Sequence, residues 1–277
     1  MSSIPLVRLS DEHLIPQIGL GVWQVPDDEA TQACLSAFEV GYRHIDTAAL
    51  YGNEEGVGRA VATCGIPREE LFITTKVWNS DHGRDRTVAA LHTSLERLAL
   101  DYVDLYLIHW PTPARDLYVE TWQTVLELQQ QGLIKSAGVS NFHGEHLRRI
   151  IDATGETPVV NQIELHPWLP QRQIRAINAD LGIVTEAWSP LASGGLVEDA
   201  RLATIGTKYG KSAAQVMIRW HLQIGNVVLP KSVTPERIAA NIDVFDFQLD
   251  ADDLITIEDM EDSSRRTGPN PDDFNQA

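Results

Sequence analysis

Short apolar runs rich in β-branched residues alternate along the chain with amphipathic stretches of helical period. Several runs, such as LFITTKV and YVDLYLIHW, are hydrophobic at nearly every position, which is typical of parallel strands covered on both faces. Eight units of strand and helix favour a (β/α)8 barrel, and periodicity alone leaves an open, doubly wound sheet as the alternative. The predicted strands are residues 19–23, 43–48, 71–77, 102–110, 134–141, 159–165, 183–189 and 226–232.

The two ends of the chain depart from this repeat. VRLS and LIP, separated by DEH, predict a small N-terminal β-hairpin ahead of the barrel. After the eighth unit, LDADDLITIEDME has the pattern of an extra helix, and the polar segment SSRRTGPNPDDFNQA is expected to form a short C-terminal extension without regular structure. No linker or shift in composition divides the chain, so residues 1–277 are interpreted as a single barrel domain.

Charge and composition limit the partners. A formal net charge of −17 and a pI near 4.8 disfavour nucleic acids and anionic membranes, because the overall field repels both. Cys34 and Cys64 lie in apolar helical stretches, which favours reduced thiols over a disulfide. Neither a signal peptide nor an apolar run of about 18 residues is present. We therefore expect a cytoplasmic monomer that binds a small molecule, with no nucleic-acid or membrane partner.

Polar side chains interrupt the predicted strands near their C-terminal ends, where (β/α)8 barrels carry their chemistry. Asp46, Lys76 and His109 end strands two, three and four, and Tyr51 lies in the loop after strand two. Later strands carry further polar or aromatic side chains near the same end, namely Ser140, Asn141, Gln162, Glu164, His166, Trp188, Ser189, Lys231 and Ser232.

The first four of these residues suit proton donation to a carbonyl oxygen. Asp46 and Lys76 are expected to pair, because neither charge can be left alone in a partly buried setting. The Lys76 cation should lower the pKa of Tyr51 from about 10 and make it a competent general acid, while His109 orients the carbonyl oxygen. The competing interpretation is a structural ion pair with a packing tyrosine and a core histidine.

Three other patterns fail on spacing or context. GLGVWQ lacks the third glycine of a dinucleotide fingerprint, and GTKYGKS has one residue too few between its glycines for a P-loop. His143 and His146 are close in sequence but have no further Cys or His nearby, so no metal site is predicted.

Six segments, in matching order and spacing, carry a family resemblance: GYRHIDTAALYGNEEGVG, ITTKVW, DYVDLYLIHWP, GVSNF, NQIELHP and LPKSVTPERIAAN. Together they resemble the aldo-keto reductases over nearly the whole chain, from Ile15 to about Phe247. The resemblance implies a barrel enzyme without a Rossmann domain that transfers hydride from NADPH to aldehydes and ketones. It also implies that the family's catalytic tetrad, with the tyrosine as proton donor, is Asp46, Tyr51, Lys76 and His109.

The same resemblance implies a cofactor site along strands five to eight. The nicotinamide carboxamide would be held by Ser140, Asn141 and Gln162. Trp188 stands where many members carry a tyrosine, and either aromatic can stack on the nicotinamide ring. The segment beside the pyrophosphate matches Ser189, Pro190 and Leu191. The site of the 2′-phosphate and adenine matches Lys231, Ser232, Val233, Thr234, Arg237 and Asn241, and Ala240 replaces an acidic residue often found there.

The substrate cleft is predicted from three tryptophans. Trp23, Trp78 and Trp110 lie at or just beyond the ends of strands one, three and four, with Asn53 as a further candidate for the same cleft. The short tail is expected to leave one side of this cleft open, with broad specificity as the consequence. Within the family, YGNEEGVG, HWPTPA, RWHLQ and DVFDF are most similar to bacterial 2,5-diketo-D-gluconate reductases. This implies keto-sugar acids, methylglyoxal-like dicarbonyls or simple aldehydes as substrates.

Two other functional classes compete with this interpretation. A barrel that binds a cofactor without catalysis is disfavoured by the complete tetrad. A metal-dependent barrel hydrolase is disfavoured because the sequence lacks the clusters of His, Cys and acidic residues that hold such metals.

Overall fold

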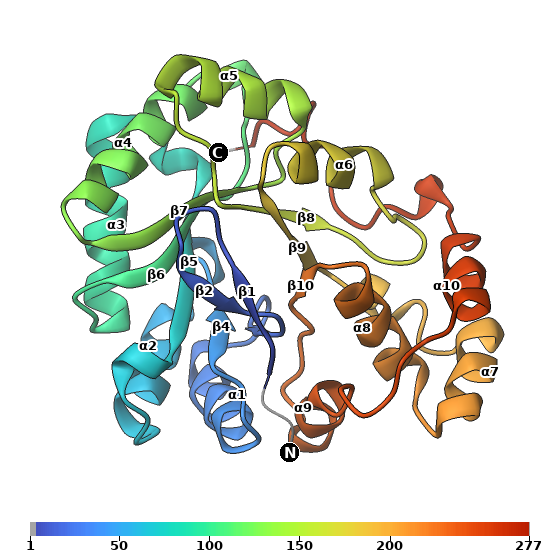
Figure 1. The fold of residues 1–277 in the computed structure, drawn as a ribbon. Helices are drawn as coiled ribbons and strands as arrows, with labels where there is room; N and C mark the ends of the chain where they lie inside the picture. Colours follow the sequence, from blue (N-terminus) through green and yellow to red (C-terminus); the bar gives the residue numbers. More distant parts are fainter. Residues whose placement is uncertain (1–3, 277) are drawn as a thin grey trace.

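The computed structural model describes residues 4–276. Parallel bridges from Ile18 to Val228 and from Gly21 to Lys231 join the first strand of the main sheet to the last, so the sheet closes into a barrel (Figure 1). The predicted (β/α)8 fold is confirmed, as are its eight strands. In chain order these are β3 (Leu20–Gly21), β4 (His44–Asp46), β5 (Phe72–Val77), β6 (Val103–Ile108), β7 (Ile134–Ser140), β8 (Val160–Glu164), β9 (Val184–Trp188) and β10 (Val227–Val228).

Helices surround the barrel (Figure 1). The apolar faces of the helices and the strands meet in one continuous core. One helix follows each strand: α1 (Asp27–Glu39), α2 (Glu54–Thr63), α3 (Arg84–Leu98), α4 (Tyr118–Gln130), α5 (Gly144–Thr154), α6 (Arg172–Asp180), α8 (Ala213–Gln223) and α9 (Pro235–Ile242). Two helices are additions to this repeat, α7 (Ala200–Tyr209) ahead of α8 and α10 (Ala251–Glu258), the predicted extra helix. Within residues 4–276, no helix has both the length and the apolar character needed to cross a bilayer.

The predicted N-terminal hairpin, β1 (Leu6–Arg8) with β2 (Leu14–Pro16), lies across one end of the barrel (Figure 1, dark blue). Strand residues alternate in direction, so Leu105 and Leu107 belong to a core inside the barrel, whereas Tyr106 and Ile108 belong to the core beneath the helices. We call the inner cluster the apolar plug; it consists of Leu9, Ile15, Phe72, Leu105, Leu107, Val159, Val160 and Val227. The plug fills the N-terminal end of the barrel and leaves the opposite end, the mouth, for polar residues.

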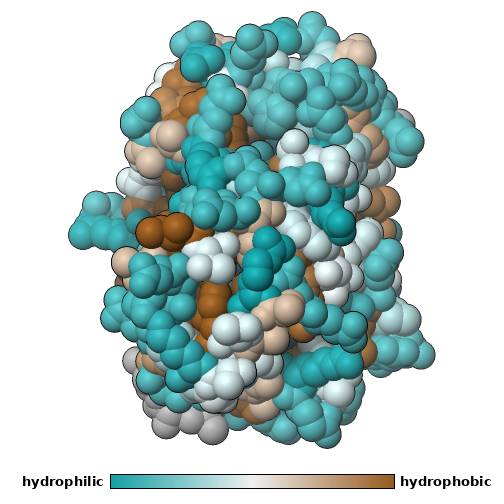
Figure 2. Space-filling model, turned by 90° about the vertical axis from the view of Figure 1, so that its right-hand side faces the viewer, coloured by the Kyte–Doolittle hydropathy of each residue, from teal (hydrophilic) through white to brown (hydrophobic). Residues whose placement is uncertain are grey.

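The outer face over α7 and α10 is mainly hydrophilic, with scattered apolar side chains (Figure 2). Its charges are partly paired: Lys211 contacts Asp243 at 2.9 Å and Asp246 at 2.7 Å, and Lys208 contacts Asp253 at 3.2 Å. Each of these pairs joins a mostly buried side chain, Lys211 or Asp253, to an exposed partner.

Candidate active site

Asp46 and Lys76 form a buried ion pair in the mouth of the barrel. Nζ of Lys76 donates to Oδ1 of Asp46 at 2.7 Å and to the carbonyl oxygen of Thr47 at 2.8 Å, and the lysine has no exposed surface. Burial alone would lower the pKa of Lys76, but the negative charge of Asp46, together with Tyr51 and Glu186, raises it above its ordinary value. Lys76 is therefore an ammonium ion at neutral pH, fixed in place by its two acceptors.

Tyr51 lies in the 3₁₀ turn η1 (Ala49–Tyr51) that follows β4. Its hydroxyl oxygen is 3.4 Å from Nζ of Lys76, at the outer limit of hydrogen bonding. Burial raises the pKa of Tyr51 above its ordinary value, and the Lys76 cation offsets this only in part. The predicted net lowering of the Tyr51 pKa is therefore wrong, because burial destabilises the phenolate more than one neighbouring ammonium group stabilises it. Tyr51 stays protonated at neutral pH, with a cation beside it.

His109 follows β6, and its side chain lies beside Tyr51. Its ring makes edge contacts with Tyr51 and Trp78, at centroid distances of 5.7 and 5.1 Å. Burial, followed by the positive charge of Lys76, lowers the pKa of His109 well below its ordinary value. The imidazole is therefore neutral and can offer one N–H donor. The structure thus brings together the four side chains that the sequence placed in one catalytic group.

Ser140, Asn141 and Trp188 form a hydrogen-bonded ledge beside this group. The Asn141 amide nitrogen donates to the His109 carbonyl oxygen and to Oγ of Ser140, both at 3.0 Å. Its side-chain oxygen accepts from the Trp188 indole nitrogen at 2.9 Å. Since both amide hydrogens of Asn141 are used, this side chain offers a ligand only its oxygen. Trp188 is partly exposed at the end of β9, as a stacking surface requires.

Gln162, on β8, connects the ion pair to a buried acid that the sequence analysis missed. Its amide nitrogen donates to Oδ2 of Asp46 at 2.8 Å and to Oε2 of Glu186 at 2.7 Å. Glu186 lies on β9 and has no exposed surface. The only signal for it was an acidic residue within the strand IVTEAWS.

Glu164 anchors the C-terminal tail beside Trp188. Its carboxylate accepts from the backbone N–H and hydroxyl of Thr267, at 2.5 and 2.8 Å, and from the N–H of Gly268 at 2.8 Å. A Cβ atom at position 268 would lie 2.6 Å from Cη2 of Trp188, so only glycine fits. His166 completes the anchor, with Nε2 at 2.9 Å from the Glu164 carboxylate.

The same tail supplies an aromatic side chain that the sequence analysis missed. The ring of Phe274 lies 4.6 Å from Trp110 and 6.4 Å from Trp78, between ring centroids. The expectation of an open side therefore does not hold along these two tryptophans, because Phe274 covers them. Trp23, in contrast, remains 51% exposed.

Asn53 does not line this cleft. It is fully buried, and its amide nitrogen donates to the carbonyl oxygens of Val22 and Val25 at 2.8 and 2.9 Å. Its oxygen accepts from the Thr47 hydroxyl at 2.7 Å. The prediction for Asn53 is wrong, because the side chain turns inward and braces the loop after β3.

Cationic side chains without acidic partners lie beyond β10. Lys231 and Arg237 are exposed, and neither forms a salt bridge with any of the residues 4–276. Between them, Oγ of Ser232 accepts from the N–H of Thr234 at 3.2 Å, just before α9 begins. A helix N-terminus with two free cations favours binding of an anion, although the protein as a whole is acidic.

The remaining predicted cofactor residues lie on α9 or in loops. Asn241 is buried on α9, and Val233 is 39% exposed. The loop directly after β9 holds Ser189, Pro190 and Leu191.

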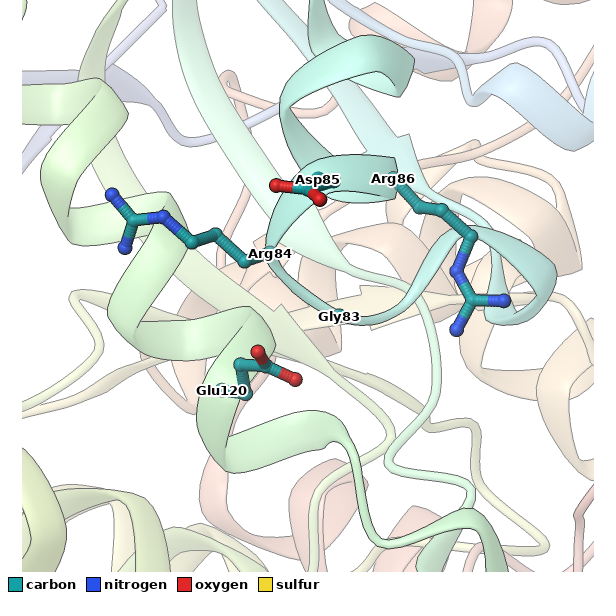
Figure 3. Close-up of a pocket in the computed structure, with 5 residues that line it drawn as sticks. All are labelled: Gly83, Arg84, Asp85, Arg86 and Glu120. Atoms are coloured by element: carbon teal, nitrogen blue, oxygen red, sulfur yellow. The ribbon is translucent and has the colours of Figure 1, made fainter.

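A separate hollow of about 370 Å³ lies on the outer rim, where α3 begins (Figure 3). Arg84 and Arg86 point away from each other there; Arg84 pairs with Glu127 at 2.6 Å and Arg86 donates to the His82 carbonyl oxygen at 2.9 Å. With no converging groups, this hollow lacks the features of a ligand site. Residues 4–276 also contain no group of three or more His, Cys or acidic side chains placed to hold a metal ion. Of the two histidines considered above, His143 contacts Asp272 of the tail at 2.8 Å.

Comparison with known proteins places this mouth in context. The aldo/keto reductase family model matches residues 17–262. The chain is 56% identical over 276 residues to the methylglyoxal reductase DkgA of Escherichia coli (strain K12), covering 99% of both chains. It is 54% identical over 271 residues to an aldo-keto reductase of Mycobacterium sp. (strain JLS), covering 98% of both. A crystal structure of a Gox0644 mutant in complex with NADPH superimposes with a TM-score of 0.95 at 48% identity, covering 99% of both chains.

Proposed function

The chain belongs to the aldo/keto reductase family, and from that premise we propose that its barrel mouth reduces a carbonyl group with NADPH, with Tyr51 as proton donor. The activity class is NADPH-dependent carbonyl reduction. The observation that carries the assignment of residues is the Tyr51 hydroxyl, 3.4 Å from an ammonium group that is itself fixed at 2.7 Å by Asp46. His109 lies beside both.

The residues present fit NADPH. Asn141 offers an amide oxygen to the nicotinamide carboxamide, and Ser140 and Gln162 would help to hold that group. Trp188 offers a partly exposed indole face beside these residues. Lys231 and Arg237 offer two free cations for the 2′-phosphate, and the loop after β9 would run beside the pyrophosphate. When bound, the reduced nicotinamide supplies the hydride that the carbonyl carbon takes up.

The tetrad handles the proton. Because the pKa of Tyr51 is raised, its hydroxyl carries a proton at neutral pH and can donate it to the carbonyl oxygen. Lys76 stabilises the negative charge that then develops on the phenolate, and Asp46 keeps the ammonium aimed at it. Neutral His109 orients the carbonyl oxygen by donating its N–H.

The aromatic wall of Trp78, Trp110 and Phe274 supports a small carbonyl substrate, since Phe274 narrows the cleft on that side. We propose a small α-dicarbonyl such as methylglyoxal, the compound named for the relative that is 56% identical. We also propose that the protein acts as a single-domain monomer in the cytoplasm. Its two free cysteines and its net charge of −17 support a reducing compartment without nucleic-acid partners.

The test follows the loss of NADPH absorbance with methylglyoxal, a keto-sugar acid and a simple aldehyde. Tyr51→Phe should reduce kcat by about 10²-fold or more and leave the Kd for NADPH nearly unchanged, since only the proton donor is lost. Tyr102→Phe is the matched control, because Tyr102 precedes β6 at the other end of the barrel. If Tyr51→Phe keeps about a third of kcat while chemistry limits the rate, Tyr51 is not the donor.

A further inference from the structure

The mechanism above does not use the buried carboxyl group of Glu186. Glu186 is fully buried inside the barrel, where its Oε2 accepts from the Gln162 amide nitrogen at 2.7 Å. Its other oxygen, Oε1, is buried and has no hydrogen-bond partner among residues 4–276. A carboxylate in that position would hold an unsolvated charge, whereas a carboxylic acid would not.

One amide group joins this acid to the catalytic ion pair. The Gln162 nitrogen carries two hydrogens and directs one to each carboxyl group, at 2.8 Å for Asp46 and 2.7 Å for Glu186. The second oxygen of Asp46 accepts from Lys76 at 2.7 Å. Contacts therefore run without a gap from Glu186 through Gln162 and Asp46 to Lys76 and Tyr51.

The groups that face Glu186 contain one positive charge. His44 and Asp46 come from β4, Lys76 from β5 and Tyr51 from η1, while neighbouring β10 consists of Val227 and Val228. The nearest ring nitrogen of His44 is 3.9 Å from Oε1, and burial lowers the pKa of His44 to about 3, so this ring is neutral.

Asp46 therefore forms the direct ion pair with the single ammonium group, and the charge of a second buried carboxylate would have no compensating cation. The pKa of Glu186 agrees with this count, since burial and then the charge of Asp46 raise it to about 8. Of the two carboxyl groups, Glu186 is the one that holds a proton near neutral pH.

We propose that Glu186 is a positioning residue that is protonated in the resting enzyme and sets, through Gln162 and Asp46, the pH at which Tyr51 changes from proton donor to base. The proposal rests on the proposed role of Tyr51. As the pH rises, Glu186 releases its proton to solvent, and the new negative charge disfavours the tyrosinate. Tyr51 then remains a proton donor to higher pH than it would without Glu186.

Glu186→Gln tests this, because the amide has the same shape and stays neutral at every pH. In reduction, kcat near neutral pH should stay within about twofold of the unmodified enzyme, and the midpoint of its loss at high pH should fall by about one pH unit. The rise of alcohol oxidation with NADP⁺ should move down by a similar amount. The control is Glu54→Gln, a buried acid on α2 bonded to Thr75 instead of Gln162, which should move neither midpoint.

A second measurement needs no catalysis. Difference infrared spectra of the unmodified protein should show the carbonyl band of a protonated carboxyl group near neutral pH, which disappears on raising the pH through about 8 and is absent in Glu186→Gln. Unchanged midpoints in Glu186→Gln, or no such band, would overturn the proposal. A band without any carbonyl reduction would instead contradict the proposed function and leave the protonated Glu186 in place.

Discussion

The two ends of the barrel are built from the same strands and have opposite interiors. On β5, Phe72 belongs to the apolar plug, whereas Lys76 lies in the mouth. On β8, Val160 belongs to the plug, and Gln162 and Glu164, two and four residues further on, are hydrogen-bonded in the mouth. A few residues along a strand thus separate an apolar cluster from a site that buries a lysine and three acids.

This difference teaches where stability and chemistry are located in the molecule. The plug gains stability from apolar burial and has no group that can react. The mouth buries charges that need partners, and those partners also place the proton donor and its neighbouring cation. We therefore expect substitutions at the two ends to affect different measurements.

The largest effect on stability is expected in the plug. Leu105→Ala should lower the free energy of unfolding by about 2–5 kcal/mol, because a fully buried leucine leaves a cavity. The kcat of the folded fraction should be nearly unchanged. Urea denaturation measures the first quantity, with Leu50→Ala, 48% exposed at the mouth, as the control that should cost little. Equal losses of unfolding free energy in the two variants would contradict the expected difference between the plug and the mouth.

Cofactor selectivity comes next and belongs to the mouth alone. If Lys231 and Arg237 bind the 2′-phosphate, replacing both with Ala should remove most of a preference for NADPH over NADH of about 10²-fold. The Kd for NADH should hardly change, and NADPH binding should lose salt dependence. Replacing Arg84 and Arg86 makes the same change in charge on the outer rim (Figure 3) and should leave selectivity intact. A double variant that still discriminates would place the 2′-phosphate elsewhere.

The smallest effect concerns the nicotinamide platform. Trp188→Ala should weaken NADPH binding by about 1–2 kcal/mol, because the aromatic surface is lost and Asn141 loses its indole donor. NADPH should quench less tryptophan fluorescence in this variant than in the unmodified protein. Trp188→Phe keeps the ring and should retain most of the affinity. An unchanged Kd in Trp188→Ala would mean that the ring does not stack there.

Local patterns predicted the features that depend on local sequence. Apolar runs identified every barrel strand, and interruptions at strand ends identified Asp46, Lys76 and His109, because side-chain direction follows the strand repeat. The contact from Asp46 through Gln162 to Glu186 was not predictable, since it spans β4, β8 and β9 and depends on how the closed barrel aligns them.

The remaining differences have equally specific causes. Phe274 lies in a tail without periodicity, so nothing in the sequence indicated that it covers Trp110. Asn53 follows the Tyr51 turn closely, yet chain proximity did not reveal which way its side chain turns. The direction in which the pKa of Tyr51 shifts depends on how deeply the hydroxyl is buried, which the sequence does not give.

The most direct test of the division between plug and mouth measures kcat for carbonyl reduction and the free energy of unfolding on Tyr51→Phe and Leu105→Ala together. Tyr51→Phe should lose about 10²-fold or more in kcat while its free energy of unfolding changes by less than about 1 kcal/mol. Leu105→Ala should lose about 2–5 kcal/mol of stability and keep its kcat. If both variants lose activity and stability in parallel, or if Leu105→Ala loses kcat while its stability is retained, the two ends do not divide these roles.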